Sequence, residues 1–123
     1  MSEQPLVLVA DDDDDILMLL RIGLQRVGLE VVVAHDGEEA LRIARELKPR
    51  VAVLDVSMPN LDGLEVLGAL RSDGAETRVV LLTAKAQETD VERGYAAGAD
   101  AYLKKPFSPA ELVARVQSLL GGT

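Results

Sequence analysis

The chain has 123 residues, 48% of them hydrophobic and only 2% aromatic, and its formal net charge is −8. This length and composition favour one domain with an aliphatic core, and the negative charge argues against direct binding to nucleic acid or to an anionic membrane. The absence of cysteine excludes disulfides and zinc–thiolate sites.

The first two predicted elements flank a run of five aspartates. Leu6–Ala10 (LVLVA) is a short apolar run of the kind that forms a strand covered on both faces. After Asp11–Asp15 the helical period begins, with an apolar stripe formed by Ile16, Leu19, Leu20, Gly23, Leu24 and Val27. Gly28 is expected to end this helix. Asp13 or Asp14 is the expected N-cap, and the last aspartate falls in the first turn, where the helix dipole favours negative charge.

Strand-like and helical segments alternate through the rest of the chain. The further strands are predicted at Val31–Ala34, Val51–Leu54, Val79–Leu82 and Ala101–Leu103. The further helices are predicted at Gly37–Leu47, about Leu64–Arg71, about Gln87–Ala97, and from Ser108-Pro109 onward. Ser108 is a good N-cap for the fifth helix because Pro109 follows it and Glu111 stands in the capping-box position.

This alternation predicts an α/β fold, with a five-stranded parallel sheet doubly wound by five helices. Residues 5–120 are expected to form the domain, and residues 121–123 a loose tail or linker stump. MSEQPLVL shows no signal-peptide pattern, and no apolar run approaches the ~20 residues of a membrane span. We therefore expect a cytoplasmic protein with no membrane partner.

Polar side chains follow the predicted strands at the point where each strand ends. These residues are Asp11 and Asp12, then Asp55, then Thr83, and finally Lys104 and Lys105 before Pro106. The carboxyl ends of parallel strands share one edge of the sheet, so these groups are expected to lie close together. Carboxylate oxygens suit Mg²⁺, and a metal with a lysine suits a transferring phosphoryl group. Aspartate is an accepted nucleophile for that chemistry.

At these residues the chain resembles the receiver domains of bacterial two-component response regulators. The matching motifs are VADDD at residues 9–13, LDVSMPNLDG at residues 54–63, LLTA at residues 81–84 and YLKKPF at residues 102–107. Four motifs in this order, each at a strand end, make the resemblance specific, and it covers about residues 5–120. It implies a flavodoxin-like sheet with strand order 2-1-3-4-5.

The resemblance also implies a Mg²⁺ (or Mn²⁺) site and an acceptor. Asp55 is expected to take a phosphoryl group from a histidine kinase or a phosphotransfer protein. Asp12 is expected to bind the metal directly and Asp11 directly or through water, together with Asp55 and the backbone carbonyl of Ser57. A phosphoryl group adds about −1.5 to −2 charges to a site that already holds three carboxylates, so the charge balance itself requires a divalent cation.

Three further residues receive roles from the resemblance. Lys105, which directly precedes proline, is expected to pair with the acceptor carboxylate or with the phosphoryl oxygens, and its bond to Pro106 is expected to be cis. Thr83 and Tyr102 are expected to form the switch that alters the surface of the fourth helix, fifth strand and fifth helix. Lys104 is expected to be solvated.

Homodimerisation through that surface, favoured by phosphorylation, is a further expectation. Asp100, Glu111 and Arg115 match charges used in the dimers of the winged-helix branch of the family, whereas Val91 and Ala101 depart from that pattern. Whether the chain is a single-domain regulator or the receiver part of a transcriptional regulator is left open.

Other residues and functions fit the sequence less well. Asp62-Gly63 is read as turn chemistry, with Gly63 in a special backbone conformation, and His35 as a surface or packing residue. A haloacid-dehalogenase-type phosphohydrolase with Asp11 as nucleophile leaves the Asp55 motif unexplained, and a flavodoxin needs a phosphate loop and aromatics. No glutamate stands where an EF-hand needs one. We therefore expect a phosphoacceptor that assists its own phosphorylation and dephosphorylation, and not a classical enzyme.

Overall fold

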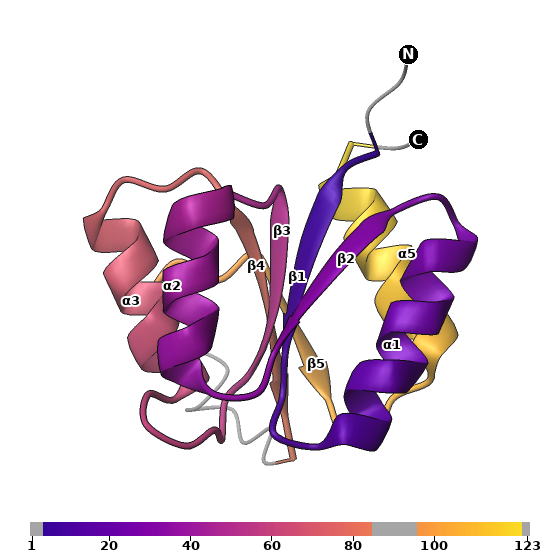
Figure 1. Ribbon diagram of the computed structural model, residues 1–123, viewed down its shortest axis with the longest axis horizontal. Helices are drawn as coiled ribbons and strands as arrows, with labels where there is room; N and C mark the ends of the chain where they lie inside the picture. The colour runs from indigo at the N-terminus through magenta and orange to yellow at the C-terminus, as the bar shows by residue number, and fades with distance from the viewer. Residues whose placement is uncertain (1–3, 85–95, 122–123) are drawn as a thin grey trace.

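The computed structural model describes residues 4–84 and 96–121, and its five parallel strands form one sheet in the order β2-β1-β3-β4-β5 (Figure 1). The strands are β1 (Leu6–Ala10), β2 (Glu30–Ala34), β3 (Val51–Asp55), β4 (Arg78–Thr83) and β5 (Ala101–Lys104). The helices among the described residues are α1 (Asp14–Arg26), α2 (Gly37–Leu47), α3 (Gly63–Ser72) and α5 (Pro109–Leu119). The predicted α/β class and strand order are confirmed. Most of the predicted helix Gln87–Ala97, and Val91 with it, lies outside the described residues.

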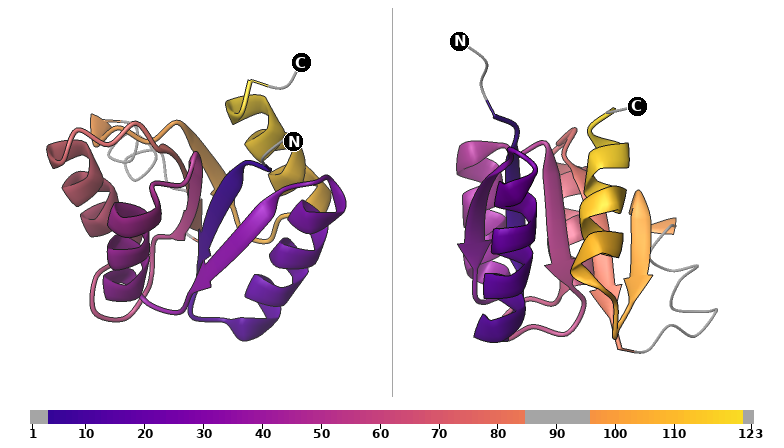
Figure 2. Two further views of the ribbon diagram at one scale, coloured as in Figure 1. Left: turned by 45° about the horizontal axis from the view of Figure 1, so that its top comes forward. Right: turned by 90° about the vertical axis from the view of Figure 1, so that its right-hand side faces the viewer.

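Helices cover both faces of the sheet, α1 and α5 on one side and α2 and α3 on the other (Figure 2). Successive strand residues point to opposite faces, so each strand contributes to two cores. The core under α1 and α5 includes Val7, Val9, Val51, Val53, Val80, Leu82, Leu20 and Leu112. The core under α2 and α3 includes Leu8, Ala10, Ala52, Leu54, Leu81, Ile43 and Leu67. The continuous apolar runs in the sequence are therefore explained by burial on both faces.

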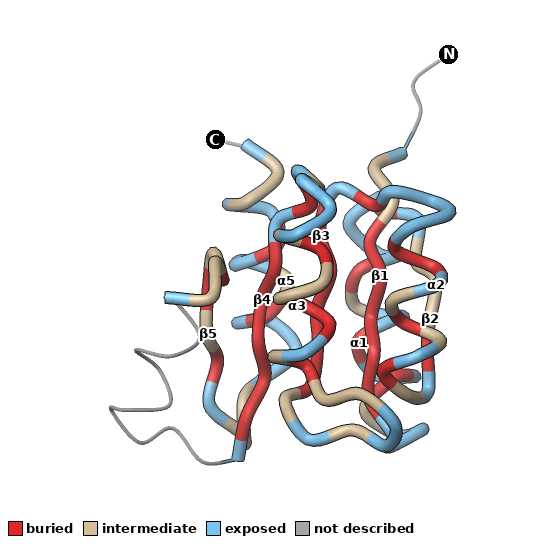
Figure 3. The backbone as a smooth tube through the Cα atoms, turned by 90° about the vertical axis from the view of Figure 1, so that its left-hand side faces the viewer, coloured by how far each residue is buried: buried red, intermediate tan, exposed pale blue. Residues whose placement is uncertain are grey.

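Burial is deepest in the centre of the sheet (Figure 3). All five residues of β3 are buried, whereas β2 at one edge exposes Glu30 and only half-buries its valines. The last residue of β3 is Asp55, and the last residue of β4 is Thr83. Both polar side chains therefore belong to buried strands, one residue beyond the strand ends predicted from the sequence.

Caps fix where the helices begin and end. Asp13 is the N-cap of α1 and accepts hydrogen bonds from two backbone N–H groups, which settles the choice between Asp13 and Asp14. Ser108 forms the predicted capping box with Glu111 at the start of α5. Gly28 has φ +85° and ends the first helical segment as predicted.

Two local expectations are wrong. The buried face of α1 uses Leu17 with Leu20 and Leu24, whereas Leu19 is 56% exposed, so the predicted stripe is rotated from the real one. Gly63 does not have a positive φ. Asn60, in the loop between β3 and α3, does, with φ +71°.

The surface also carries the single histidine. His35 lies at the surface as expected, with Nε2 3.3 Å from Asp14 and Nδ1 3.2 Å from Glu39. Across residues 4–84 and 96–121, no helix has both the length and the apolar character that crossing a bilayer demands.

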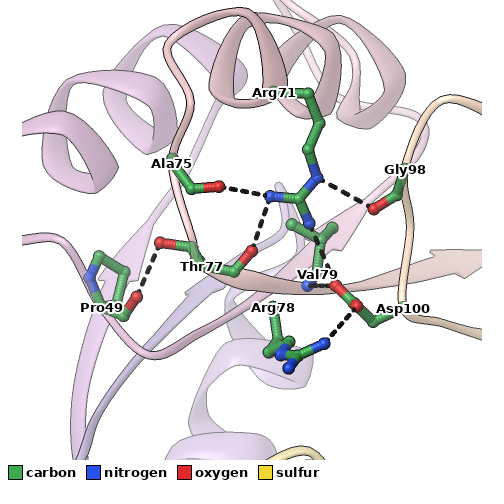
Figure 4. A network of polar contacts seen from close by, with 8 residues as sticks. All are labelled: Pro49, Arg71, Ala75, Thr77, Arg78, Val79, Gly98 and Asp100. Carbon is green, nitrogen blue, oxygen red and sulfur yellow. Dashed lines mark hydrogen bonds and ion pairs between the residues drawn. The ribbon is translucent and has the colours of Figure 1, made fainter.

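A polar network ties elements together at the edge where the strands begin (Figure 4). The Arg71 guanidinium, at the end of α3, is its centre. It donates to the carbonyls of Gly98 (3.1 Å), Ala75 (3.0 Å) and Thr77 (2.9 Å) and to the Asp100 carboxylate (3.1 Å). Asp100 also accepts from Arg78 and from the Val79 N–H. The Asp100 charge, which matches a dimer charge in sequence, is therefore engaged within the chain.

Candidate functional site

The two central strands, β1 and β3, bring the first candidate residues together. Ala10 pairs with Leu54 in the sheet register, and each is followed by an aspartate, Asp11 and Asp55. The Asp11 N–H donates to the Ala34 carbonyl at 3.2 Å, which extends the sheet hydrogen bonds by one residue. Backbone pairing thus places Asp11 and Asp55 at the edge where the parallel strands end, which is the lower edge of the sheet in Figure 1.

Three carboxylates meet at this edge. One oxygen each from Asp11, Asp12 and Asp55 lies within 4.8 Å of the other two. Asp11 is fully buried and Asp55 is 4% exposed, whereas Asp12 is exposed to solvent. Three oxygen ligands of this type at such spacing fit a hard divalent cation that also keeps several waters. The exposed Asp12 leaves the cluster open to solvent on one side.

Lys105 supplies the positive charge next to this cluster. Its Nζ lies 3.1 Å from Asp11 Oδ2 and 3.2 Å from Asp55 Oδ2, so one ammonium bridges the two buried carboxylates. Its backbone N–H donates to the Thr83 carbonyl at 2.6 Å, and the Lys105-Pro106 peptide bond is cis, as the resemblance implies. Lys104 is exposed, as expected.

The electrostatics of the site reflect burial of the ionisable groups and the closeness of two carboxylates. Burial and the neighbouring Asp11 charge raise the pKa of Asp55 to about 6, although Lys105 and the Ser57 N–H act in the opposite direction. Burial lowers the pKa of Lys105, but its hydrogen bonds and charge interactions with Asp11 and Asp55 outweigh this, and the pKa is raised overall. The lysine therefore remains charged, and the Asp55 carboxyl ionises less readily than an ordinary aspartate.

The loop of residues 56–62 carries Ser57, whose carbonyl is the fourth predicted metal ligand. The Val56 N–H donates to the Leu82 carbonyl at 2.8 Å, and the Ser57 N–H donates to Asp55 Oδ1 at 3.3 Å. The loop closes where the Gly63 N–H, at the start of α3, donates to the Val56 carbonyl at 2.9 Å. Ser57 thus lies beside Asp55, and its role as a metal ligand stays a prediction.

Thr83 and Tyr102 lie on β4 and β5, the two strands on one side of the strand that carries Asp55. Thr83 is buried at the end of β4, and Tyr102 is half-buried on β5, paired in register with Leu81. The Tyr102 side chain packs with the core under α2 and α3. The positions suit a switch, and the switching role itself stays a prediction.

Two groups near the site received no role from the sequence. The Asp13 backbone N–H donates to Asp11 Oδ1 at 3.0 Å and helps to orient that carboxylate. Gly37, at the start of α2, lies against the backbone of the loop of residues 56–62 at Leu61. A glycine at the first position of a helix is the only sign of this contact in the sequence, because glycine is a poor helix former.

Comparison with known proteins gives one consistent family. The family model of the response regulator receiver domain matches residues 7–117 of the sequence. The transcriptional regulatory protein PrrA of Mycobacterium tuberculosis is 52% identical over 116 residues, which are 94% of this chain and 50% of that protein. The alkaline phosphatase synthesis transcriptional regulatory protein PhoP of Bacillus subtilis is 47% identical over 93% of this chain and 48% of that protein. The chain thus spans about half the length of these relatives.

Solved structures agree with this family. The receiver domain of the Francisella response regulator 1452 superposes with a TM-score of 0.92 at 39% identity, covering 96% of this chain and 98% of that one. The BeF3-activated receiver domain of DrrB superposes with a TM-score of 0.87 at 36% identity, covering 97% and 99%.

Proposed function

Because the chain belongs to the response regulator receiver domain family, we propose that Asp55 is its phosphoacceptor and that a histidine kinase or a phosphotransfer protein is the donor. Membership of this family means that the chain functions as a receiver domain of two-component signalling. The residue assignments rest on the site. The observation that carries them is the meeting of Asp11, Asp12 and Asp55 with Lys105 at one sheet edge.

The Asp55 carboxylate is the nucleophile of the proposed reaction. One of its oxygens forms a bond to phosphorus while the bond from phosphorus to the donor histidine nitrogen breaks, and the electron pair of that bond stays on the imidazole. The ionised form is needed, and the pKa of about 6 leaves most Asp55 ionised at neutral pH. Lys105 lies within ion-pair distance of Asp55 and is placed to balance charge on the transferred phosphoryl oxygens.

A divalent cation fits the chain's own residues at this edge. Asp11, Asp12 and Asp55, with the Ser57 carbonyl beside them, would hold Mg²⁺ or Mn²⁺. The raised pKa of Asp55, caused by burial and by Asp11, supports this assignment because Lys105 alone does not offset the crowding of carboxylates. When bound, the cation supplies charge neutralisation to the transferring phosphoryl group.

Thr83 and Tyr102 are proposed as the switch. Thr83 is one strand away from Asp55, since Asp55 pairs with Leu82 in the sheet register. Its hydroxyl would donate to a new phosphoryl oxygen, and Tyr102 on the adjacent β5 would move inward with it. A single new hydrogen bond of this kind biases an element that has two arrangements. The altered surface would include β5 and α5 and the predicted helix between β4 and β5.

We also propose a homodimer, favoured by phosphorylation, through this altered surface. The structure leaves fewer charged residues for its interface than the sequence suggested. Asp100 is bound to Arg71 and Arg78 within the chain, which leaves two exposed charges on α5: Glu111, whose side chain also accepts in the capping box with Ser108, and Arg115. Light scattering over a concentration series, with and without beryllofluoride, tests it. A mass that rises only with beryllofluoride supports the dimer, and a constant monomer mass contradicts it.

Phosphorylation by a small donor tests the main proposal. The protein is incubated with acetyl phosphate and Mg²⁺, and its intact mass is measured. Wild type is expected to gain one hydroxylamine-labile phosphoryl group, and none when EDTA replaces Mg²⁺. Asp55→Asn is expected to gain none. Asp62→Asn is the matched control, because Asp62 lies in the same loop but caps α3, and asparagine caps a helix equally well. Labelling of Asp55→Asn, or its loss in Asp62→Asn alone, would contradict the assignment.

A further inference from the structure

The first turn of α2 contacts the loop of residues 56–62, which follows Asp55, so closely that no side chain fits between them. A Cβ added to Gly37 would lie 1.8 Å from the Leu61 carbonyl oxygen, 2.5 Å from its carbonyl carbon and 2.6 Å from its Cβ. Real Cβ atoms stay at least 3.0 Å from such neighbours. Because the nearest atoms are backbone, a rotamer change cannot relieve the clash. The loop or the helix would have to move.

Hydrogen bonds hold the loop at the same place. The Gly37 N–H donates to the Pro59 carbonyl at 3.2 Å, and the Leu61 N–H donates to the same carbonyl at 2.9 Å. The first N–H groups of a helix have no partner within the helix, so α2 has a free donor to offer there. Gly37 thus contacts the loop both by sterics and by a hydrogen bond.

The start of α3 holds the other end of the loop in the same manner. The Gly63 N–H donates to the Val56 carbonyl, and a Cβ at Gly63 would lie 2.5 Å from the carbonyl oxygen of Asp55 itself. Two helix starts therefore fix the short segment that includes Asp55 and Ser57. Gly63 lies next to Asp55, whereas Gly37 comes from a different helix and meets the loop at Pro59 and Leu61.

We infer that Gly37 is a positioning residue for the acceptor site: its lack of a side chain lets α2 set the position of the loop that carries the Ser57 carbonyl and follows Asp55. This inference rests on the proposed function. The helix itself gives no reason for glycine, since alanine is the better helix former and Gly37 does not have a positive φ. A side chain at Gly37 would push Leu61 back from 1.8 Å to at least 3.0 Å. Displacements of about 1 Å in a reacting site can reduce rates about 100-fold.

The test compares two glycine-to-alanine substitutions in helices. Gly37→Ala is the test variant. Gly68→Ala is the matched control, because Gly68 lies in α3 with no atom within 4 Å of an added Cβ. Circular dichroism and thermal unfolding report folding. Titration with Mn²⁺, followed by the electron paramagnetic resonance of the free ion, reports metal affinity without any reaction. Acetyl phosphate at saturating Mg²⁺ then gives the maximal phosphorylation rate.

Gly37→Ala is expected to stay folded. Loss of a contact that supports a metal site typically weakens binding about 10-fold or more, so we expect Mn²⁺ to bind about 10-fold more weakly. Phosphorylation is expected to be about 10- to 100-fold slower. Gly68→Ala is expected to match wild type in both. A folded Gly37→Ala with wild-type Mn²⁺ affinity and rate would overturn the inference, because a purely structural glycine would change stability alone. Wild type that binds Mn²⁺ but takes no phosphoryl group would instead overturn the proposed function and leave the Mn²⁺ comparison valid.

A second variant covers the case in which Gly37→Ala does not fold. Leu61→Gly keeps the room at Gly37 but frees the loop backbone that rests on it. It is expected to weaken Mn²⁺ binding in the folded protein, and an unchanged Mn²⁺ affinity would overturn the inference.

Discussion

Replacing Asp55 by asparagine is expected to stabilise the metal-free protein at neutral pH. The site packs Asp11 and Asp55 together, with one ammonium, from Lys105, between them. Burial and the Asp11 charge raise the pKa of Asp55 to about 6, so its ionised form is less favourable in the folded chain than in the unfolded chain. Asparagine keeps the shape of the side chain and removes the charge.

The magnitude and pH window follow from the two pKa values of Asp55. A carboxyl whose pKa rises from 3.8 to about 6 on folding costs the folded state about 3 kcal/mol once it is ionised. The folded state binds the proton more tightly, so this penalty is absent below about pH 4, grows as the pH rises to about 6, and is constant above. The pKa of about 6 already includes the attraction of Lys105, so this penalty is a net value, and we expect Asp55→Asn to gain about 1–3 kcal/mol at pH 8.

Urea unfolding in EDTA, from pH 4 to pH 8, measures this gain. The difference between Asp55→Asn and wild type is expected to increase across the window and to shrink when Mg²⁺ is added, because wild type retains one more carboxylate for the cation. Glu38→Gln, an exposed carboxylate in the first turn of α2, controls for loss of one charge and should change stability by less than about 0.5 kcal/mol. An Asp55→Asn variant that is less stable than wild type at pH 8 without metal would refute the reasoning.

Three further substitutions probe other contacts. Lys105→Met leaves Asp11 and Asp55 buried without their cation and is expected to cost about 3 kcal/mol in urea unfolding at pH 8 in EDTA, so an unchanged midpoint would contradict the ion pairing. Arg71→Met removes four hydrogen bonds at the opposite edge of the sheet from Asp55, and we expect the free energy of unfolding to fall by about 3 kcal/mol. The phosphorylation rate per folded molecule is expected to stay unchanged, and a slower rate would show that the network acts on the site. Ser108→Ala is expected to lower the free energy of unfolding by about 1 kcal/mol, whereas Ser108→Asp, which can still cap α5, is expected to change it very little. Thermal unfolding distinguishes the two variants, and equal losses of stability would contradict the role of Ser108 as the N-cap.

The sheet and its polar edge could be predicted from the sequence because both depend on local patterns. Five apolar runs without alternation fixed the strands to within one residue at each end, and burial on both faces is the physical reason for that pattern. Once the strands are parallel, whatever follows each of them must gather at one edge. Asp11, Asp55 and Lys105 are close for that reason alone, although they are far apart in the chain.

Features that depend on contacts between elements could not be predicted. The face of α1 that is buried depends on how the helix rotates against β1 and α5, and in the periodic sequence Leu19 fits the stripe as well as Leu17 does. The role of Gly37 depends on the approach of a loop from a different part of the chain. Gly63 was expected to be needed for its backbone angles, and it is needed for space against Asp55 instead.

The charge count at the edge links stability to signalling. Asp11, Asp12 and Asp55 with Lys105 leave an excess of two negative charges, which a divalent cation cancels. A phosphoryl group on Asp55, the proposed acceptor, would replace one carboxylate charge by about −1.5 to −2, so the phosphorylated site with a cation would be less negative than the metal-free, unphosphorylated site. Burial of Asp55 beside Asp11 raises the pKa of Asp55 and disfavours its ionised form in the metal-free fold, and the same arrangement would favour binding of a cation. A variant that relieves the crowding should gain stability and lose metal binding together, because one electrostatic interaction determines both.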